Sequence, residues 1–222
     1  MNKKEYKLVV FDVDGTLLDT SEGLLKSTIY TIDKLGYPMP TKEVLLSFVG
    51  PRIQDSLAKV FGLQGEELDK AAAVFRNHYK EEAVMLAKPY EGMHVVLQNL
   101  KNRNIHMAIA TNKRQDFIER LADKYGISEY IKVICGTDFQ GKLKKEDLIR
   151  NCIKEFPECS TKDTVMIGDS AYDAEAAERV GVDFIGATYG FDFKSAEEVQ
   201  KWSSVTSINR MIEILEIIDL RE

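Results

Sequence analysis

The stretch "YKLVVFDVDGTLLDT", residues 6–20, decides the fold class and raises the first chemical question. Its apolar run over 7–11 has the length and the β-branched composition of a strand that is buried on both faces of a sheet. The run ends on two acids, Asp12 and Asp14, and a glycine follows at once. Side chains two residues apart in an extended segment point the same way, so these carboxylates repel each other unless a cation lies between them.

Length, charge and cysteine content narrow the class of protein. The chain has 222 residues and a formal net charge of -6, which suits one large domain or a core with a smaller insert. The acidic balance is a weak argument against nucleic acid as the main partner, and it leaves room for an anionic small substrate. Three cysteines without a CxxC pair indicate reduced thiols and a cytoplasmic protein. No apolar segment approaches the length of a membrane span, so we expect no membrane partner, and either a monomer or a homodimer fits these features.

Further short apolar runs alternate with amphipathic stretches of helical period. This alternation predicts an α/β fold, in which parallel strands are joined by right-handed crossovers. The tail over 208–218 has the pattern of a closing amphipathic helix. The other predicted elements are strands over 105–110, 132–135, 164–168 and 183–187, and helices over 91–102, 114–125, 144–156 and 171–180.

A long helix-like span separates the first two predicted strands. It covers roughly 20–88, and its first segment carries apolar residues at helical spacing before it stops at a glycine. We therefore expect an α/β core formed by 1–18 and 88–222, with a helical domain, 19–87, inserted after the first strand.

Two further strand ends carry side chains with possible chemistry. "MAIATNKR", residues 107–114, ends its apolar run on Thr111 and Asn112. A hydroxyl and free backbone N–H groups at such a place bind phosphate oxygens, although a plain N-cap for the next helix explains this motif equally simply. In "VMIGDSAYDAEAAERVG", Asp169 follows a strand and Asp173 lies near a helix start, where acids also serve as caps.

The acids favour a metal site over separate caps. Asp12, Asp14 and Asp169 all lie at the carboxyl ends of predicted parallel strands, which meet at one edge of a sheet. Three acids at that edge suit a hard divalent ion such as Mg²⁺. The segment "GKLKKEDLIRNCIKEF" adds a cation: Lys145 comes directly before an apolar-periodic run, and Lys142 is the alternative for contacting a phosphate.

These four segments, in this order, resemble the motifs of the haloacid dehalogenase (HAD) superfamily, in its phosphatase branch. "DVDGT" is similar to the first motif, "ATN" to the second, the lysine of "KKEDLI" to the third and "GDSAYD" to the fourth. The resemblance covers essentially the whole chain, and "FVGPRIQDSL", residues 48–57, is similar to a turn of the phosphoglycolate-phosphatase-like group. It implies a Rossmann-like three-layer α/β/α core with a parallel sheet and an all-α cap. One departure is the absence of the Lys-Pro-x-Pro that many relatives carry at the third motif.

The resemblance implies a Mg²⁺-dependent phosphatase that hydrolyses a small phosphomonoester metabolite through an aspartyl-phosphate. Asp12 would be the nucleophile, and Asp14 would protonate the leaving oxygen and then activate water. Mg²⁺ would be held by the carboxylates of Asp12 and Asp169 and by the backbone carbonyl of Asp14.

The remaining positions of the resemblance concern the phosphate and the leaving group. Thr111, the Asn112 backbone and Lys145 would hold the phosphoryl oxygens, and Asp173 would orient a metal-bound water or Lys145. The inserted domain would close over the site, with hinges near 16–21 and 86–91, and Arg52 is the candidate for contacting an anionic substrate group. A surface arginine is an equally good description of Arg52.

Three other readings compete with a phosphatase. A phosphomutase of the β-phosphoglucomutase type shares all four motifs and differs in the phosphoryl acceptor. A dehalogenase needs neither Mg²⁺ nor an acid two residues after the nucleophile, so Asp14 argues against it. A catalytically silent regulatory or binding protein would be free to lose Asp12 or Asp14, and both are present.

The histidines give no catalytic or metal pattern. His78, His94 and His106 share no metal-ligand spacing, and none adjoins a serine or cysteine in a triad arrangement. We therefore expect structural roles for all three.

Overall fold

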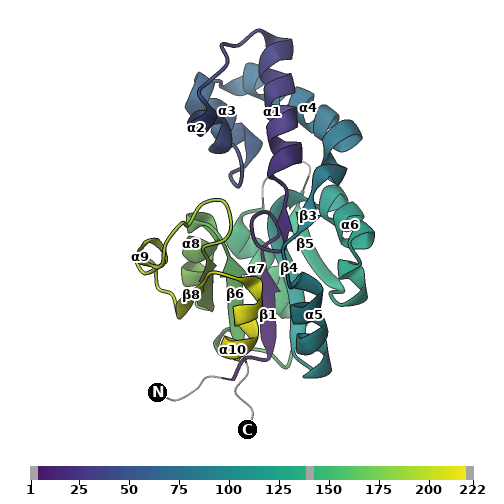
Figure 1. Ribbon diagram of the computed structural model, residues 1–222, viewed down its shortest axis with the longest axis vertical. Coiled ribbons are helices and arrows are strands. Elements are labelled where there is room, and N and C mark those ends of the chain that lie inside the picture. Colours follow the sequence, from purple (N-terminus) through teal and green to yellow (C-terminus); the bar gives the residue numbers. More distant parts are fainter. Residues whose placement is uncertain (1–4, 139–142, 219–222) are drawn as a thin grey trace. The chain divides into compact units, whose positions relative to one another are not determined.

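The computed structural model describes residues 5–138 and 143–218 (Figure 1). The chain divides into two compact units, which we call the α/β unit (Met1–Leu18 with Pro89–Glu222) and the helical unit (Asp19–Lys88). Two short strands, β2 (Leu18–Asp19) and β3 (Lys88–Pro89), pair where the chain passes from one unit to the other. Within the described residues, no helix has both the length and the apolarity that a membrane span requires.

The α/β unit is built on a six-stranded parallel sheet in the order β5–β4–β1–β6–β7–β8. β1 lies at the centre, and all four of its residues are buried. The strand order reverses between β1 and β6, and ligands bind at the carboxyl ends of strands beside such a reversal. The strands are β1 (Leu8–Phe11), β4 (His106–Arg114), β5 (Val133–Thr137), β6 (Thr164–Gly168), β7 (Asp183–Ala187) and β8 (Thr206–Ile208).

Helices cover both faces of this sheet and form the three expected layers. α5 and α6 pack on one face of the sheet, over β4 and β5. α7 and α8 pack against each other on the opposite face. One core cluster joins Leu8 and Val10 of β1 to apolar side chains of α7 and α8, so alternate β1 residues face the two helix layers. The helices are α5 (Met93–Asn102), α6 (Gln115–Lys124), α7 (Lys145–Lys154), α8 (Ala171–Val180), α9 (Ala196–Val199) and α10 (Ile214–Ile218), with short 3₁₀ turns η3 (Ile127–Glu129), η4 (Thr161–Asp163) and η5 (Met211–Glu213).

The structure adds one strand to those that the sequence predicts and corrects two element boundaries. β8 was not expected, because only Ile208 of its three residues is buried and so no apolar run marks it. The predicted closing helix over 208–218 is wrong at its start, since Ile208 still pairs in the sheet and helical structure begins at Met211. β4 also continues to Arg114, four residues beyond its apolar run.

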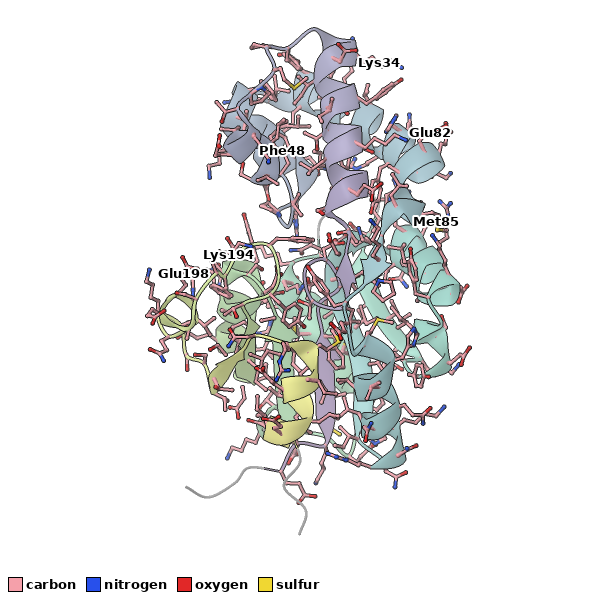
Figure 2. The ribbon with its side chains drawn as sticks, in the orientation of Figure 1. Lys34, Phe48, Glu82, Met85, Lys194 and Glu198 are labelled. Atoms are coloured by element: carbon pink, nitrogen blue, oxygen red, sulfur yellow. The ribbon has the colours of Figure 1, made fainter. Side chains whose placement is uncertain are left out.

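The helical unit contains α1 to α4 and two irregular turns that follow α4. Its core gathers Phe48, Leu57 and Leu63 around two alanines of α4, and Phe48 is marked among these helices in Figure 2. Gly23 of α1 lies against the chain after α4, because a Cβ there would come within 2.3 Å of the carbonyl oxygen of Ala83. The elements are α1 (Ser21–Leu35), α2 (Lys42–Leu46), α3 (Ile53–Phe61), α4 (Gly65–His78), a π turn η1 (Tyr79–Ala83) and a 3₁₀ turn η2 (Val84–Leu86).

Candidate active site

The tip of β1 carries the first acid into the sheet edge. The backbone N–H of Asp12 donates to the carbonyl of Ile167 at 2.9 Å, which extends the pairing of β1 and β6 by one residue. The chain then turns, and the carbonyl oxygen of Val13 accepts hydrogen bonds from the backbone N–H groups of residues 16–18. Within this turn, Gly15 adopts the left-handed region with φ 84°. Asp12 is thus fixed and buried at the carboxyl end of the central strand.

A buried lysine lies between two of the acids. Lys145, the first residue of α7, places its Nζ 2.5 Å from Oδ1 of Asp12 and 2.7 Å from Oδ1 of Asp173. All three side chains are buried, so these are charge-assisted contacts with little screening by water. Lys142, the alternative lysine, lies outside the described residues.

Asp173 serves the helix and the lysine at once. Its Oδ2 accepts from the hydroxyl of Ser170 at 2.6 Å and from its backbone N–H at 3.2 Å, which completes the capping box of α8. The other oxygen, Oδ1, faces Lys145. The two interpretations offered by the sequence, a helix cap and a site residue, therefore apply to different oxygens of one carboxylate.

The side chain of Asp169 lies between two backbone segments, and the residue next to it in each segment is a glycine. Its Oδ2 accepts from the backbone N–H of Phe191 at 2.5 Å. A Cβ built on Gly15 would lie 2.0 Å from that oxygen, and one built on Gly190 would lie 2.4 Å from it. Sequence reasoning missed Gly190 and Phe191, because the loop after β7 carries no pattern of its own that marks contact with β6.

Three carboxylates meet at this edge with one ammonium among them. Asp12, Asp169 and Asp173 each offer an oxygen within 4.8 Å of the others. Burial raises the pKa of Asp12 to about 7; Lys145 opposes the rise, and Asp173 and Asp14 add to it. Burial also raises the pKa of Asp169 well above its ordinary value, with Asp173 and Asp12 as further causes. A buried cluster of this charge favours binding a hard cation, and its oxygen donors are those that Mg²⁺ prefers.

The side chain of Asp14 lies outside this carboxylate cluster, and the sequence-based expectation for Asp14 concerned its backbone carbonyl. The carboxylate of Asp14 is turned to a different lysine, Lys113, whose Nζ lies 3.0 Å from Oδ1 of Asp14. Both side chains are largely covered, with 3% of the Lys113 side chain and 14% of the Asp14 side chain exposed. Sequence reasoning missed Lys113, because the apolar run that marks this strand ends at Ala110 and the strand itself continues to Arg114.

The bulge in β4 explains how Lys113 reaches this place. Pairing with β5 is regular up to Ala110, shifts register, and resumes at Arg114 opposite Thr137. Bulges of this kind redirect side chains beside active sites. The N–H of Lys113 donates to the hydroxyl of Thr111 at 3.2 Å, and the hydroxyl of Thr137 donates to the carbonyl of Asn112 at 3.2 Å.

Thr111 and Asn112 therefore lie inside β4. The sequence had placed them just after the end of this strand. The alternative that they form the N-cap of the next helix is wrong, because α6 begins at Gln115 and its N-cap is Arg114. Oδ1 of Asn112 is buried and has no hydrogen-bond partner among the described residues. Leaving a buried acceptor without a partner costs free energy, so Oδ1 of Asn112 is still available to accept a hydrogen bond.

Arg52 belongs to the helical unit, where it immediately precedes α3 and is partly buried.

Comparison with known proteins assigns the family. A model of the haloacid dehalogenase-like hydrolases matches residues 9–187, which include every acid and lysine of the candidate site. The chain belongs to the haloacid dehalogenase-like hydrolase family. The resemblance drawn from the four motifs is confirmed, and with it the α/β class and the phosphatase branch.

Individual HAD relatives extend over most of the chain. A phosphoglycolate phosphatase of Agrobacterium fabrum is 31% identical over 190 residues, covering 83% of this chain and 81% of that protein. The tyrosine-protein kinase PtkA of Mycobacterium tuberculosis is 27% identical over 186 residues, and this chain spans only 63% of its length. Among solved structures, a predicted phosphatase from Clostridium acetobutylicum has a TM-score of 0.90 and 30% identity, covering 98% of this chain and all of that one.

Proposed function

We propose that this HAD protein is a Mg²⁺-dependent phosphatase that hydrolyses a small phosphomonoester metabolite through an aspartyl-phosphate on Asp12. The observation that carries the proposal is the buried contact between Lys145 and Asp12 at the edge where Asp169 and Asp173 also meet. A lysine in this place favours the ionised form of a buried carboxylate, and an ionised carboxylate is the form that attacks phosphorus.

In the first step an oxygen of Asp12 forms a bond to phosphorus while the bond to the leaving oxygen breaks. Lys145 holds Oδ1 of Asp12, which fixes the orientation of the carboxylate before the substrate arrives. Asp14 donates a proton to the leaving oxygen and then takes one from the water that hydrolyses the aspartyl-phosphate. Lys113, 3.0 Å from Asp14, holds the carboxylate in place through both proton transfers.

The phosphoryl oxygens are assigned to Thr111, the Asn112 backbone and Lys145. The β4 bulge supports this assignment, because it exposes backbone groups that a regular strand pair would use in the ladder. Such donors stabilise negative charge as it shifts during phosphoryl transfer.

The acids that would hold Mg²⁺ are Asp12 and Asp169, with the Asp14 carbonyl as the third protein ligand. The donor set fits, because all of these are oxygens and the carboxylate cluster is short of positive charge. A bound Mg²⁺ supplies screening of the repulsion between the nucleophile and the anionic phosphate. Asp173 also contacts Lys145 and helps to fix the position of its ammonium.

The helical unit, residues 19–87 in the sequence-based division, is proposed to be the cap that selects the leaving group. Its linkers contain β2 and β3, where the chain leaves and re-enters the α/β unit. Arg52 is proposed to contact an anionic part of the substrate. Phosphoglycolate, 5′-nucleotides, sugar phosphates and pyrophosphate are all candidate substrates. Cysteines 135, 152 and 159 are free thiols, which supports a cytoplasmic protein.

A screen of phosphorylated metabolites, with and without Mg²⁺, tests this proposal. Release of inorganic phosphate that needs Mg²⁺ and disappears in Asp12→Asn is the expected result. Interconversion of sugar phosphate isomers without net phosphate release would instead identify a phosphomutase. Because one relative is described as a tyrosine kinase, the screen includes ATP with the protein alone; phosphotyrosine formation without phosphatase activity would overturn the proposal.

A further inference from the structure

A second group of metal-ligating side chains lies in the α/β unit, away from the acids. His106 begins β4, and Glu158 and Cys159 lie between α7 and η4. Nε2 of His106 is 2.7 Å from Oε1 of Glu158. These two atoms and the sulfur of Cys159 all lie within 4.8 Å of one another.

This group occupies the opposite edge of the sheet from the candidate active site. His106 pairs with Leu8 at the amino end of β1, whereas Asp12 follows the carboxyl end of the same strand. Four residues of strand at roughly 3.3 Å each separate the two edges by on the order of 13 Å. A ligand at His106 is therefore distinct from one at the acids.

The side chains are held by the segment that carries them. The ring of His106 packs on Phe156, with centroids 4.7 Å apart, and the backbone N–H of Cys159 donates to the carbonyl of Phe156 at 2.8 Å. Cys159 is buried, while 41% of the His106 side chain and 54% of the Glu158 side chain are exposed. The sulfur of this group is thus buried, whereas the nitrogen and oxygen ligands belong to side chains that solvent can reach.

We propose that His106, Glu158 and Cys159 form a binding site for Zn²⁺ or a similar borderline divalent cation, with water as the fourth ligand. Imidazole, carboxylate and thiolate are the ligand types that Zn²⁺ takes in tetrahedral sites. Bonds of about 2.0–2.3 Å place ligand atoms roughly 3.3–3.6 Å apart. The His106 and Glu158 atoms, now 2.7 Å apart, would separate slightly, which is a small movement for two exposed side chains.

Metal binding here is coupled to loss of a proton. The thiolate is the form of cysteine that binds metal, so the Cys159 thiol releases its proton to solvent as its sulfur binds the cation. The binding constant should rise with pH.

Calorimetric titration of the chelator-treated protein with Zn²⁺, in excess Mg²⁺ to occupy the acids, tests the site. We expect one Zn²⁺ per chain, and binding at least tenfold weaker in Cys159→Ser and in His106→Gln. Cys135→Ser is the matched cysteine control and should bind like the unaltered protein. His106 is half exposed, so His106→Gln remains informative if Cys159→Ser folds poorly.

Co²⁺ supplies a second readout that does not depend on catalysis. A thiolate-to-metal charge-transfer band in the near ultraviolet should appear in the unaltered protein and in Asp169→Asn, and should vanish in Cys159→Ser. Three results would each overturn the proposal: no Zn²⁺ binding, equal binding in all variants, or binding that is lost in Asp169→Asn and kept in His106→Gln.

Discussion

Replacement of Lys145 by methionine is the sharpest test of the buried cluster. Methionine keeps an unbranched apolar chain of similar length and removes the ammonium that contacts Asp12 and Asp173. Breaking a buried ion pair by removing one partner costs about 3–5 kcal/mol. Because the pKa of Asp12 is already raised to about 7, part of this cost is relieved when Asp12 takes up a proton. We therefore expect a loss of about 3 kcal/mol in unfolding free energy at neutral pH.

The same substitution has a larger effect on catalysis. A hydrogen bond to a charged group is worth about 1.5–3 kcal/mol, which corresponds to a rise of roughly 1–2 units in the pKa of Asp12. From a pKa of about 7, the ionised fraction of the nucleophile then falls about 5–50-fold at neutral pH. Loss of a phosphate-binding cation adds a further factor of about 100. We expect kcat/KM to fall about 500- to 5,000-fold.

The assay compares Lys145→Met with Lys144→Met, its exposed neighbour, by urea denaturation and by phosphate release at several pH values. Lys144→Met should match the unaltered protein in both measurements. In Lys145→Met, the pH at which activity is half-maximal should move upward, because the nucleophile needs a higher pH to ionise. If Lys145→Met keeps activity within a few-fold of Lys144→Met, the contact seen at Asp12 has no part in catalysis and the reasoning is refuted.

Three further predictions concern other parts of the molecule. Lys113→Met should lower kcat more than tenfold with little change in KM, because Asp14 loses the group that positions it; a pH profile of kcat checks this. Gly190→Ala should destabilise the fold by about 1–3 kcal/mol and weaken Mg²⁺ binding, since the new Cβ would meet the Asp169 side chain at 2.4 Å; denaturation and Mg²⁺ titration measure both. The contribution of His78 to stability should be lost as the pH drops below about 6.5, because burial and then Lys26 lower its pKa and the unfolded chain takes up the proton first; His78→Asn should therefore gain stability relative to the unaltered protein between pH 7 and 5, measured by denaturation.

Each of these three predictions can fail clearly. Unchanged kcat in Lys113→Met would show that Asp14 needs no partner. Full stability and Mg²⁺ affinity in Gly190→Ala would show that the loop after β7 yields freely around Asp169. An identical pH dependence of stability in His78→Asn would remove that histidine from the acid sensitivity.

Much of the layout was predictable because it follows from local periodicity. Short buried runs identify five of the six strands, and the rule that parallel strands end at one edge brings the acids after β1 and β6 together. Lys145 was singled out because it directly precedes an apolar-periodic helix. These inferences need only the sequence within each segment and the direction of the chain.

The features that were missed depend on neighbours distant in sequence or on irregular backbone. The register shift in β4 that carries Lys113 to Asp14 is set by pairing with β5, and nothing within "ATNKR" marks it. A side chain at position 190 would clash with Asp169, which explains the glycine there. That contact joins two loops that are distant in the sequence. His106 and Cys159 meet only because β4 and β6 flank β1 at the same edge, so no spacing rule could join them.

The central claim is that Asp12 becomes covalently phosphorylated. The most direct measurement is an acid quench of the enzyme during turnover of radiolabelled acetyl phosphate, followed by peptide mapping. The account predicts protein-bound label that hydroxylamine releases, confined to the peptide that carries Asp12 and absent from Asp12→Asn. Steady phosphate release with no labelled protein at any quench time, or label on another residue, would contradict it.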